Sequence, residues 1–303
     1  MAFQDEMEQA LEAAGFAEDG QSEAGPAEVG SKAAEGKSKA DSRRYGVLII
    51  SHGSRSPEWV RLVDEAVSQV KVPEGVPVEC SFLEIVEGRL IQDGIDRLEA
   101  AGVTDIIAVP LFVSSGSTHV DEISWSLGVV PEPKLETDLP YMRRSARVHW
   151  TGPIDADPDI AALMWEKVRE LSTVPSREVL LVVGHGSKEA GFHEAWQEVL
   201  RSLAEQIGRL GGFAAVDTAM LLPEQAGEKV RRWTAERPDW GVVVAPFFLS
   251  EGYFTETVIP GRLEGLDYRY NGRALLPDPL LARWMEKRID AVLNGGADIL
   301  AGS

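Results

Sequence analysis

The sequence predicts an α/β protein made of two tandem, similar domains, each built on a parallel sheet. Three observations predict this fold class: a long internal repeat, short apolar runs, and amphipathic segments that alternate with those runs. The resulting order, strand then helix several times over, is typical of βαβ units.

The internal repeat begins with a strand-like run followed by a His-Gly-Ser turn. YGVLIISHGSRSPEWVRLVDEAV starts at Tyr45, and EVLLVVGHGSKEAGFHEAWQEVL starts at Glu178, so His52 and His185 occupy equivalent positions. The similarity continues in order, since VECSFLE matches VDTAMLL and DIIAVPLFVSSG matches WGVVVAPFFLSEG. We interpret this as a tandem duplication, with domains over residues 43–172 and 173–303.

Each half alternates buried strands with amphipathic helices. Short apolar runs predict strands that are covered on both faces; they lie at residues 47–50, 106–112, 179–183 and 242–249. Apolar residues at three- and four-residue spacing predict helices between them; these lie at residues 57–70, 90–101, 192–207 and 224–233. We expect about four strands in each half.

The charge of the chain argues against two classes of partner. Its 30 Lys and Arg against 49 Asp and Glu give a formal net charge of −19, which disfavours binding to nucleic acid or to an anionic membrane surface. Residues 1–42 contain ten acidic residues and three lysines, and are rich in Ala, Gly, Glu and Ser. This composition predicts a disordered acidic tail.

The remaining composition predicts a soluble cytoplasmic protein. No apolar run reaches the roughly 18 residues that a membrane span requires, and the acidic start of the chain does not resemble a secretory signal. The single cysteine, Cys80, excludes an internal disulfide and is expected to be a structural thiol. The sequence contains no Gly-x-Ser-x-Gly, Walker or Gly-x-Gly-x-x-Gly motif, so a hydrolase or nucleotide-binding function lacks its usual residues.

Three possible metal ligands follow strands of the first half. His52 follows one apolar run, Glu84 ends the segment VECSFLE, and His119 follows the run 106–112 across a short loop. Because ligands of open parallel sheets bind beyond the carboxyl ends of the strands, we expect these three side chains at one edge. Two imidazoles and one carboxylate with open positions suit a divalent ion such as Fe²⁺, Co²⁺, Ni²⁺ or Zn²⁺.

Each of the three residues also has a structural interpretation. His52 could hold its turn through backbone hydrogen bonds, Glu84 could pair with Arg89, and His119 could cap the helix that starts near residue 120. The second half keeps His185 but has Leu222 opposite Glu84 and Thr255 opposite His119. A set needed only for folding would be required in both halves, so its loss from one half favours a functional set.

These motifs resemble a known family. ISHGSR, the FLE at residues 82–84, VPLFVSSGSTHV and the second HGS resemble the CbiX-type sirohydrochlorin chelatases over about residues 45–290. The resemblance implies a class II chelatase fold of two α/β lobes in the long, duplicated form, with the active site in the cleft between them. It implies metal-binding roles for His52 and His119, and it matches Glu84 to the acidic residue of the family. We expect the two histidines to deliver the metal, one of them to accept a pyrrole proton, and Glu84 to complete the ligand set or relay protons.

The function that the resemblance implies is a lyase reaction, the insertion of Co²⁺ into sirohydrochlorin for cobalamin biosynthesis by the anaerobic-type route. Iron insertion for sirohaem, nickel insertion, and a non-catalytic tetrapyrrole or metal carrier are the alternatives. No cofactor is expected beyond the metal substrate, which is Co²⁺ or, in the alternatives, Fe²⁺ or Ni²⁺. Because the duplication supplies both lobes, we expect a monomer.

The substrate would be a polycarboxylate, so an acidic protein needs local basic groups to bind it. We expect Ser54, Arg55, His185 and Tyr253 to contact this substrate. Other basic candidates are Arg143, Arg144 and Arg262.

Overall fold

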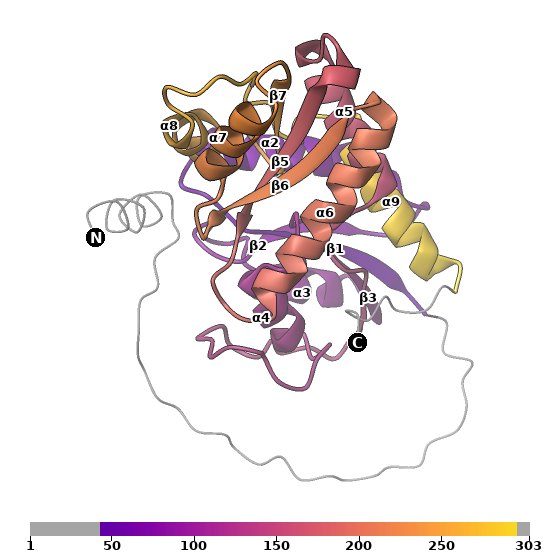
Figure 1. Ribbon diagram of the computed structural model, residues 1–303. Coiled ribbons are helices and arrows are strands. Elements are labelled where there is room, and N and C mark those ends of the chain that lie inside the picture. The colour runs from indigo at the N-terminus through magenta and orange to yellow at the C-terminus, as the bar shows by residue number, and fades with distance from the viewer. Residues whose placement is uncertain (1–42, 296–303) are drawn as a thin grey trace.

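The computed structural model describes residues 43–295 and consists of two parallel sheets with helices between and outside them (Figure 1). The predicted acidic tail, residues 1–42, lies outside the described residues, as do residues 296–303. Two parallel sheets separated by helices confirm the predicted fold class.

The first sheet has the strand order β2-β1-β3-β4, all parallel. Its strands are β1 (Tyr45–Ser51), β2 (Val78–Phe82), β3 (Asp105–Pro110) and β4 (Arg147–Trp150). The helices of this half are α2 (Pro57–Ser68), α3 (Ile91–Ala100), α4 (Thr118–Ser126) and α5 (Pro158–Val168). The central strands are almost wholly apolar because helices cover both of their faces.

The second sheet has the order β6-β5-β7, again parallel. Its strands are β5 (Glu178–Gly186), β6 (Ala215–Leu222) and β7 (Gly241–Pro246). The helices of this half are α6 (Phe192–Gly211), α7 (Ala226–Glu236), α8 (Ile259–Arg262) and α9 (Pro279–Leu293), with a π-helical turn at Phe254–Val258 before α8. The expected fourth strand is reduced to a single bridge between Val243 and Arg269.

One core joins the two halves. Alternate residues of β1 and β3, such as Ile49 and Val109, belong to the same apolar cluster as Leu180 and Val182 of β5. The opposite face of each sheet has a separate cluster, formed with α3 and α4 in the first half and with α7 and α8 in the second. The sheets therefore turn one face toward each other across a shared helical layer.

The helices of this shared layer are exchanged between the halves. Helix α5 follows β4 of the first sheet but packs against α6 and β7 of the second half. Helix α9, the last helix of the chain, packs against α2 and β3 of the first half, and Figure 1 shows it beside the first sheet. Each half thus supplies a helix to the other.

Three of these helices begin in the same way. A polar side chain accepts a hydrogen bond from a backbone N–H of the first turn, and proline is the next residue: Ser56-Pro57 at α2, Asp157-Pro158 at α5 and Asp278-Pro279 at α9. Proline lacks the N–H that would be unsatisfied there, and its restricted φ suits the first helical residue. These local signals define where α2, α5 and α9 start.

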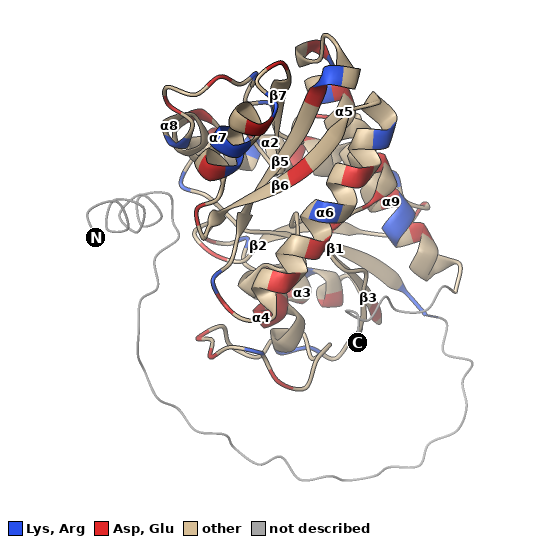
Figure 2. Ribbon diagram, viewed as in Figure 1, with Lys and Arg blue, Asp and Glu red and all other residues tan. Residues whose placement is uncertain are grey.

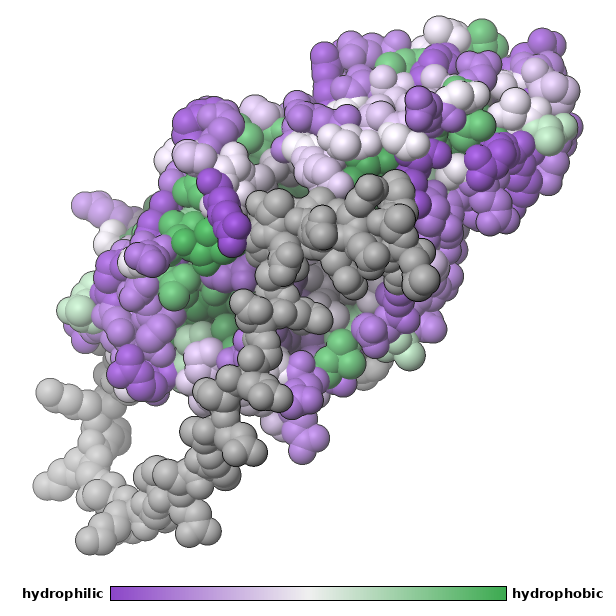
Figure 3. All heavy atoms as spheres, turned by 90° about the vertical axis from the view of Figure 1, so that its left-hand side faces the viewer, coloured by the Kyte–Doolittle hydropathy of each residue, from purple (hydrophilic) through white to green (hydrophobic). Residues whose placement is uncertain are grey.

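Charged residues lie mainly on the helices and loops, whereas the strands carry few of them (Figure 2). On the face shown in Figure 3, hydrophilic residues predominate and apolar residues gather in small areas. Within residues 43–295, no helix has the length and apolar character that crossing a membrane would require.

Candidate active site

The turn after β1 positions His52 beside the segment that follows β2. Backbone N–H groups of Leu83 and Glu84 donate to the carbonyl oxygens of Ser51 and His52, at 2.9 and 3.1 Å. Gly53 has φ +107°, and a Cβ at this position would lie 2.2 Å from the carbonyl oxygen of Glu84. Only glycine fits this turn, and the close approach holds the backbones of His52 and Glu84 side by side.

His119 is the second residue of α4, in the loop-to-helix segment that follows β3. The loop is held at Ser115, whose N–H donates to Asp155 Oδ1 at 2.7 Å, and at Gly116, whose N–H donates to Ser114 Oγ at 3.0 Å. A Cβ on Gly116 would lie 2.5 Å from Cδ1 of Trp196 on α6, so this loop lies directly against the second half. The carboxyl ends of β1 and β3 thus present two imidazoles at one edge of the sheet.

The two imidazoles face each other through their Nε2 atoms. His52 Nε2 and His119 Nε2 are 3.3 Å apart, with ring centroids 4.7 Å apart and nearly perpendicular planes. Zinc–histidine bonds are about 2.0–2.1 Å, so two imidazole ligands at tetrahedral or octahedral angles have nitrogens about 2.8–3.4 Å apart. The separation already matches that of two nitrogen ligands of one ion.

The other ring nitrogens are bonded in a way that determines the tautomers. His52 Nδ1 donates to the carbonyl oxygen of Gly53 at 3.0 Å, and His119 Nδ1 donates to Glu122 Oε1 at 2.6 Å. With both Nδ1 atoms protonated, a neutral ring has its lone pair on Nε2. Both lone pairs are therefore directed toward the space between the rings.

Burial keeps His52 neutral. Its side chain is almost completely buried, and burial lowers the pKa of His52 to about 3, with a smaller contribution from repulsion by the His119 imidazole whenever that ring is protonated. An imidazole that stays unprotonated at neutral pH is available as a metal ligand. A pKa this low makes His52 a poor proton acceptor at neutral pH, contrary to the expectation that either histidine could accept a pyrrole proton.

Glu84 lies on the other side of His52. Its Oε1 is 3.7 Å from His52 Nδ1, not beside the two Nε2 atoms, and its side chain is 38 % exposed. Burial raises the pKa of this carboxyl above its ordinary value. The alternative pairing with Arg89 is wrong, because Arg89 donates to both carboxylate oxygens of Asp64 and to a backbone carbonyl.

Sequence reasoning missed Glu122. This residue follows His119 by three positions on α4, the spacing that brings two side chains together on one helix face, and this spacing was the signal available in the sequence. Glu122 also accepts a hydrogen bond from Thr137 Oγ1 at 2.6 Å. Burial raises the pKa of Glu122, but the hydrogen bonds from His119 and Thr137 outweigh burial and leave that pKa below its ordinary value.

Among residues 43–295, no three His, Cys, Asp or Glu side chains converge as a ready metal site. The two imidazoles meet at Nε2, while Glu84 faces Nδ1 of His52 and Glu122 faces Nδ1 of His119. The arrangement is a two-nitrogen site with one carboxylate behind each ring. Two nitrogen ligands would leave most of the coordination positions of a divalent ion open.

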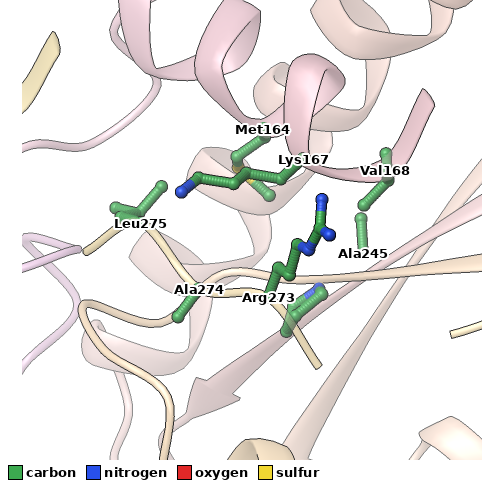
Figure 4. A pocket seen from close by; sticks show the side chains of 8 residues that line it. Met164, Lys167, Val168, Ala245, Arg273, Ala274 and Leu275 are labelled. Atoms are coloured by element: carbon green, nitrogen blue, oxygen red, sulfur yellow. The ribbon is translucent and has the colours of Figure 1, made fainter. Parts of the chain in front are cut away.

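A hollow lies beside this site on the first half. It has a volume of about 590 Å³, and its lining includes Ser54, Arg55, Arg61, Asp64 and Ile85. Ile85 has φ +70°, an unfavourable conformation for a β-branched residue, directly after Glu84. A second pocket, between α5 and β7, is lined by residues such as Met164, Lys167 and Arg273 (Figure 4) and leaves no room for a water molecule.

The second half contributes a histidine–aromatic group. His185 Nδ1 donates to the carbonyl oxygen of Gly186 at 3.0 Å, repeating the turn of His52, but its ring packs against Phe254 with centroids 5.0 Å apart. Tyr253 packs edge-on against Phe254 and is exposed. The second half lies close to the histidine pair. His185 lowers the pKa of His52, and His119 lowers the pKa of His185, because protonated imidazoles that lie near one another repel.

Two other arginines proposed as substrate contacts are engaged within the protein, while the third, Arg143, is exposed. Arg144 donates to the carbonyl oxygens of Leu127 and Ala146, and Arg262 lies 3.3 Å from a carboxylate oxygen of Glu224. Arg143 pairs with Asp96 at 3.9 Å. Arg55, by contrast, lies in the lining of the hollow next to Glu84.

A sequence profile of the CbiX family matches residues 46–171 and, separately, residues 179–292. The chain belongs to the CbiX family. The two matches correspond to the two halves of the repeat, which confirms the duplicated form and the predicted enzyme class, a metal chelatase that acts on a tetrapyrrole.

Individual relatives match one half of the chain. The sirohydrochlorin cobaltochelatase of Methanopyrus kandleri is 26 % identical over 136 residues, which are 41 % of this chain and 94 % of the relative. The sirohydrochlorin cobaltochelatase of Methanococcoides burtonii is 30 % identical over 132 residues, which are 43 % of this chain and 98 % of the relative. These relatives are therefore single-repeat proteins in length.

Solved structures match both halves together. SirB from Bacillus subtilis with Fe³⁺ superposes with a TM-score of 0.65 at 17 % identity, covering 84 % of this chain and 99 % of that structure. A CbiX described as the terminal enzyme for biosynthesis of siroheme in denitrifying bacteria gives a TM-score of 0.57 at 19 % identity, covering 81 % and 98 %. At these identities the similarity establishes the fold alone.

Proposed function

We propose that this protein is a sirohydrochlorin chelatase that inserts Co²⁺ into the macrocycle. The observation that carries the proposal is the pair of Nε2 atoms of His52 and His119, 3.3 Å apart, with both Nδ1 atoms bonded elsewhere. The names of the curated relatives support sirohydrochlorin and cobalt as the substrates.

His52 and His119 bind the metal substrate in this proposal. Two neutral nitrogen ligands hold a divalent ion while most of its coordination positions stay open to the pyrrole nitrogens. A closed four-ligand protein site would retain the ion instead of transferring it. The low pKa of His52 keeps the ring neutral throughout this transfer.

Glu84 carries protons away from the site. Insertion of a divalent ion releases two pyrrole protons, which need an acceptor connected to water. Glu84 is the carboxylate nearest to His52, and its side chain is partly exposed. The geometry supports this role over a third ligand position, because Glu84 lies on the Nδ1 side of His52.

Substrate contacts come from both halves. Arg55 and Ser54 line the hollow of about 590 Å³ beside Glu84, and a guanidinium there is suited to a peripheral carboxylate of the macrocycle. Arg61 lines the same hollow, but its guanidinium already forms ion pairs with Glu58 and Glu65. From the second half, His185 and Tyr253 offer flat surfaces for contact with the tetrapyrrole.

Iron is the second candidate metal, favoured by two observations on similar structures. One is SirB with Fe³⁺, and the other is the CbiX linked to siroheme. SirB from Bacillus subtilis subspecies spizizenii has also been solved with cobalt. Imidazole ligands accept Co²⁺, Fe²⁺ and Ni²⁺ alike, so the residues alone do not select among them.

The test is parallel insertion assays with Co²⁺, Fe²⁺ and Ni²⁺ into sirohydrochlorin under anaerobic conditions, followed by the absorbance of the metallated product. We expect the highest kcat/KM with Co²⁺. Faster insertion of Fe²⁺ or Ni²⁺ would reassign the metal, and stoichiometric binding without product would identify a carrier.

A matched pair of variants tests the substrate contact. Arg55→Ala is expected to raise the KM for sirohydrochlorin about 10- to 150-fold, since a hydrogen bond to a charged group contributes about 1.5–3 kcal/mol. Arg61→Ala, in the same hollow but already bound by two glutamates, is expected to leave that KM within about twofold. Equal effects of the two substitutions would contradict a specific contact at Arg55.

A further inference from the structure

We propose that Glu122 and Thr137 are positioning residues that hold His119 in its metal-binding orientation. This inference rests on the proposed function. It concerns a hydrogen-bonded chain behind the histidine pair, from Thr137 through Glu122 to His119.

The chain of hydrogen bonds is continuous and short. Thr137 Oγ1 donates to Glu122 Oε2 at 2.6 Å, and His119 Nδ1 donates to Glu122 Oε1 at 2.6 Å. The backbone N–H of Leu139 donates to Thr137 Oγ1 at 3.1 Å, which orients the hydroxyl. Both oxygens of Glu122 are therefore engaged, and the carboxylate cannot rotate without breaking one of these bonds.

The orientation of Glu122 determines which nitrogen of His119 can bind a metal. A carboxylate accepts but does not donate, so Nδ1 of His119 must carry the proton and Nε2 the lone pair. Partners of this type fix the tautomer and the ring plane of metal-binding histidines and raise their basicity as ligands. The Nε2 so defined is the atom that lies 3.3 Å from Nε2 of His52.

Thr137 comes from the long loop between α4 and β4, which lies over this side of the site. The same loop is attached to α4 by Lys134, whose N–H donates to Asp121 Oδ2 at 2.6 Å. The ammonium of Lys134 lies 5.3 Å from the ring centroid of Phe192, the first residue of α6 in the second half. The loop therefore connects the second half to the residues that support His119.

The second half lacks the whole arrangement. The residue equivalent to His119 is Thr255, and the one equivalent to Glu122 is Val258, which is buried in the apolar cluster of that half. Thr255 uses its hydroxyl locally, bonding to the backbone of Gly252. The carboxylate is thus absent where the histidine is absent, as expected if its purpose is to support that histidine.

The test measures Co²⁺ binding to the full-length protein by calorimetry, without tetrapyrrole, together with the KM for Co²⁺ during insertion. Glu122→Ala is expected to weaken Co²⁺ binding about 10- to 100-fold, the range found for partners behind metal ligands. Thr137→Val is expected to weaken it less, and Thr137→Ser, which keeps the hydroxyl, to restore it. In each variant the KM for Co²⁺ should rise while the KM for sirohydrochlorin stays the same.

Asp121→Asn is the matched control. Asp121 lies next to Glu122 on α4 and bonds to the same loop, but it does not bond to His119, so the control removes a charge without touching the chain. Unchanged Co²⁺ affinity in both Glu122→Ala and Thr137→Val, with wild-type thermal unfolding, would overturn the inference. A wild-type protein that binds no Co²⁺ would overturn the proposed function as well, so the two failures are distinguishable.

Discussion

The same turn is built twice in this protein, with different chemistry around each copy. In both halves a histidine lies at the carboxyl end of the central strand, directly after β1 in the first half and within the last two residues of β5 in the second. Its Nδ1 donates to the next carbonyl oxygen at 3.0 Å, and a glycine with positive φ packs against a backbone carbonyl. His52 lies beside a second imidazole, His119, and beside the carboxylate of Glu84, while a further carboxylate, Glu122, is bonded to His119. His185 instead lies against the ring of Phe254.

The comparison separates what the fold requires from what the chemistry requires. The glycine and the backbone hydrogen bond of the turn occur in both halves, so the fold explains them. His119 and Glu122 occur in the first half alone. In the second half Thr255 and Val258 replace them, and a π-helical turn followed by the short α8 takes the place of α4. The paired imidazoles and their carboxylates therefore belong to the first half, while the second half repeats the strand and the histidine turn.

The largest effect is expected from removing one imidazole of the pair. His52→Ala and His119→Ala should each lower kcat/KM for Co²⁺ insertion by more than about 100-fold, because losing a ligand exceeds the effect of losing its hydrogen-bonding partner. His185→Ala should lower it by less than about tenfold. Absorbance of the metallated product measures all three, with circular dichroism to verify folding.

This comparison would fail if His185→Ala were as damaging as His52→Ala. Equal losses would mean that both histidine turns take part in metal transfer. The difference between the halves would then lie in the shape of the site and not in its ligands.

Substitution of the two glycines is expected to separate stability from activity. A Cβ on Gly53 would lie 2.2 Å from the carbonyl oxygen of Glu84, and one on Gly186 would lie 2.4 Å from that of Leu222. Gly53→Ala and Gly186→Ala should each lower the free energy of unfolding by about 1–3 kcal/mol, measured by denaturant titration. Only Gly53→Ala should reduce metal insertion, by about 100-fold, since it displaces His52 and Glu84 from each other.

If both alanine variants lost insertion equally, the second turn would have to contribute directly to the reaction. If neither variant were destabilised, the close backbone contacts at the two turns would be less tightly packed than the distances indicate.

The smallest effect on metal insertion is expected at the opposite ends of the sheets, which also differ between the halves. In the first half His149 Nε2 lies 2.9 Å from Asp105 Oδ1; in the second, Arg269 occupies the place equivalent to His149 and lies 2.9 Å from Glu178. Burial disfavours ionisation of Glu178, but hydrogen bonds from Ser172, Thr173, Val174 and Arg269 outweigh it and lower its pKa to about 2.

The pH dependence of unfolding follows from this shift. A carboxyl group whose pKa is lowered by folding stabilises the protein above its unfolded pKa of about 4.3, and this stabilisation is lost as the pH falls toward 2. Glu178→Gln should lower the free energy of unfolding by about 2–3 kcal/mol at pH 7 and by much less at pH 2.5. Denaturant titrations across this range measure the difference, and an equal loss at both pH values would contradict an ionised Glu178.

Much of the fold could be predicted because it is encoded locally. Apolar runs revealed the strands, three- and four-residue spacing revealed the helices, and the repeat revealed the two halves. The exchange of α5 and α9 was not predicted, because the apolar stripe of a helix shows that it packs but not on which sheet. The missing fourth strand of the second sheet was unpredictable for a similar reason, since one bridge at Arg269 carries no periodic pattern.

The site could be predicted in part. Placing His52, Glu84 and His119 at one sheet edge follows from parallel topology, and the structure brings the two imidazoles together. Which nitrogen each carboxylate faces depends on the ring orientations, which sequence does not reveal. Thr137 reaches Glu122 from a long loop, so no spacing rule could have joined them.

The exchanged helices have a consequence for how this protein can move and be divided. Because α5 completes the second half and α9 completes the first, a cut at the connection after residue 171 would leave each fragment without a helix that its own sheet needs. The two lobes of this chain are interlocked by these helices. The two lobes therefore cannot separate as independent bodies without uncovering an apolar face of each sheet.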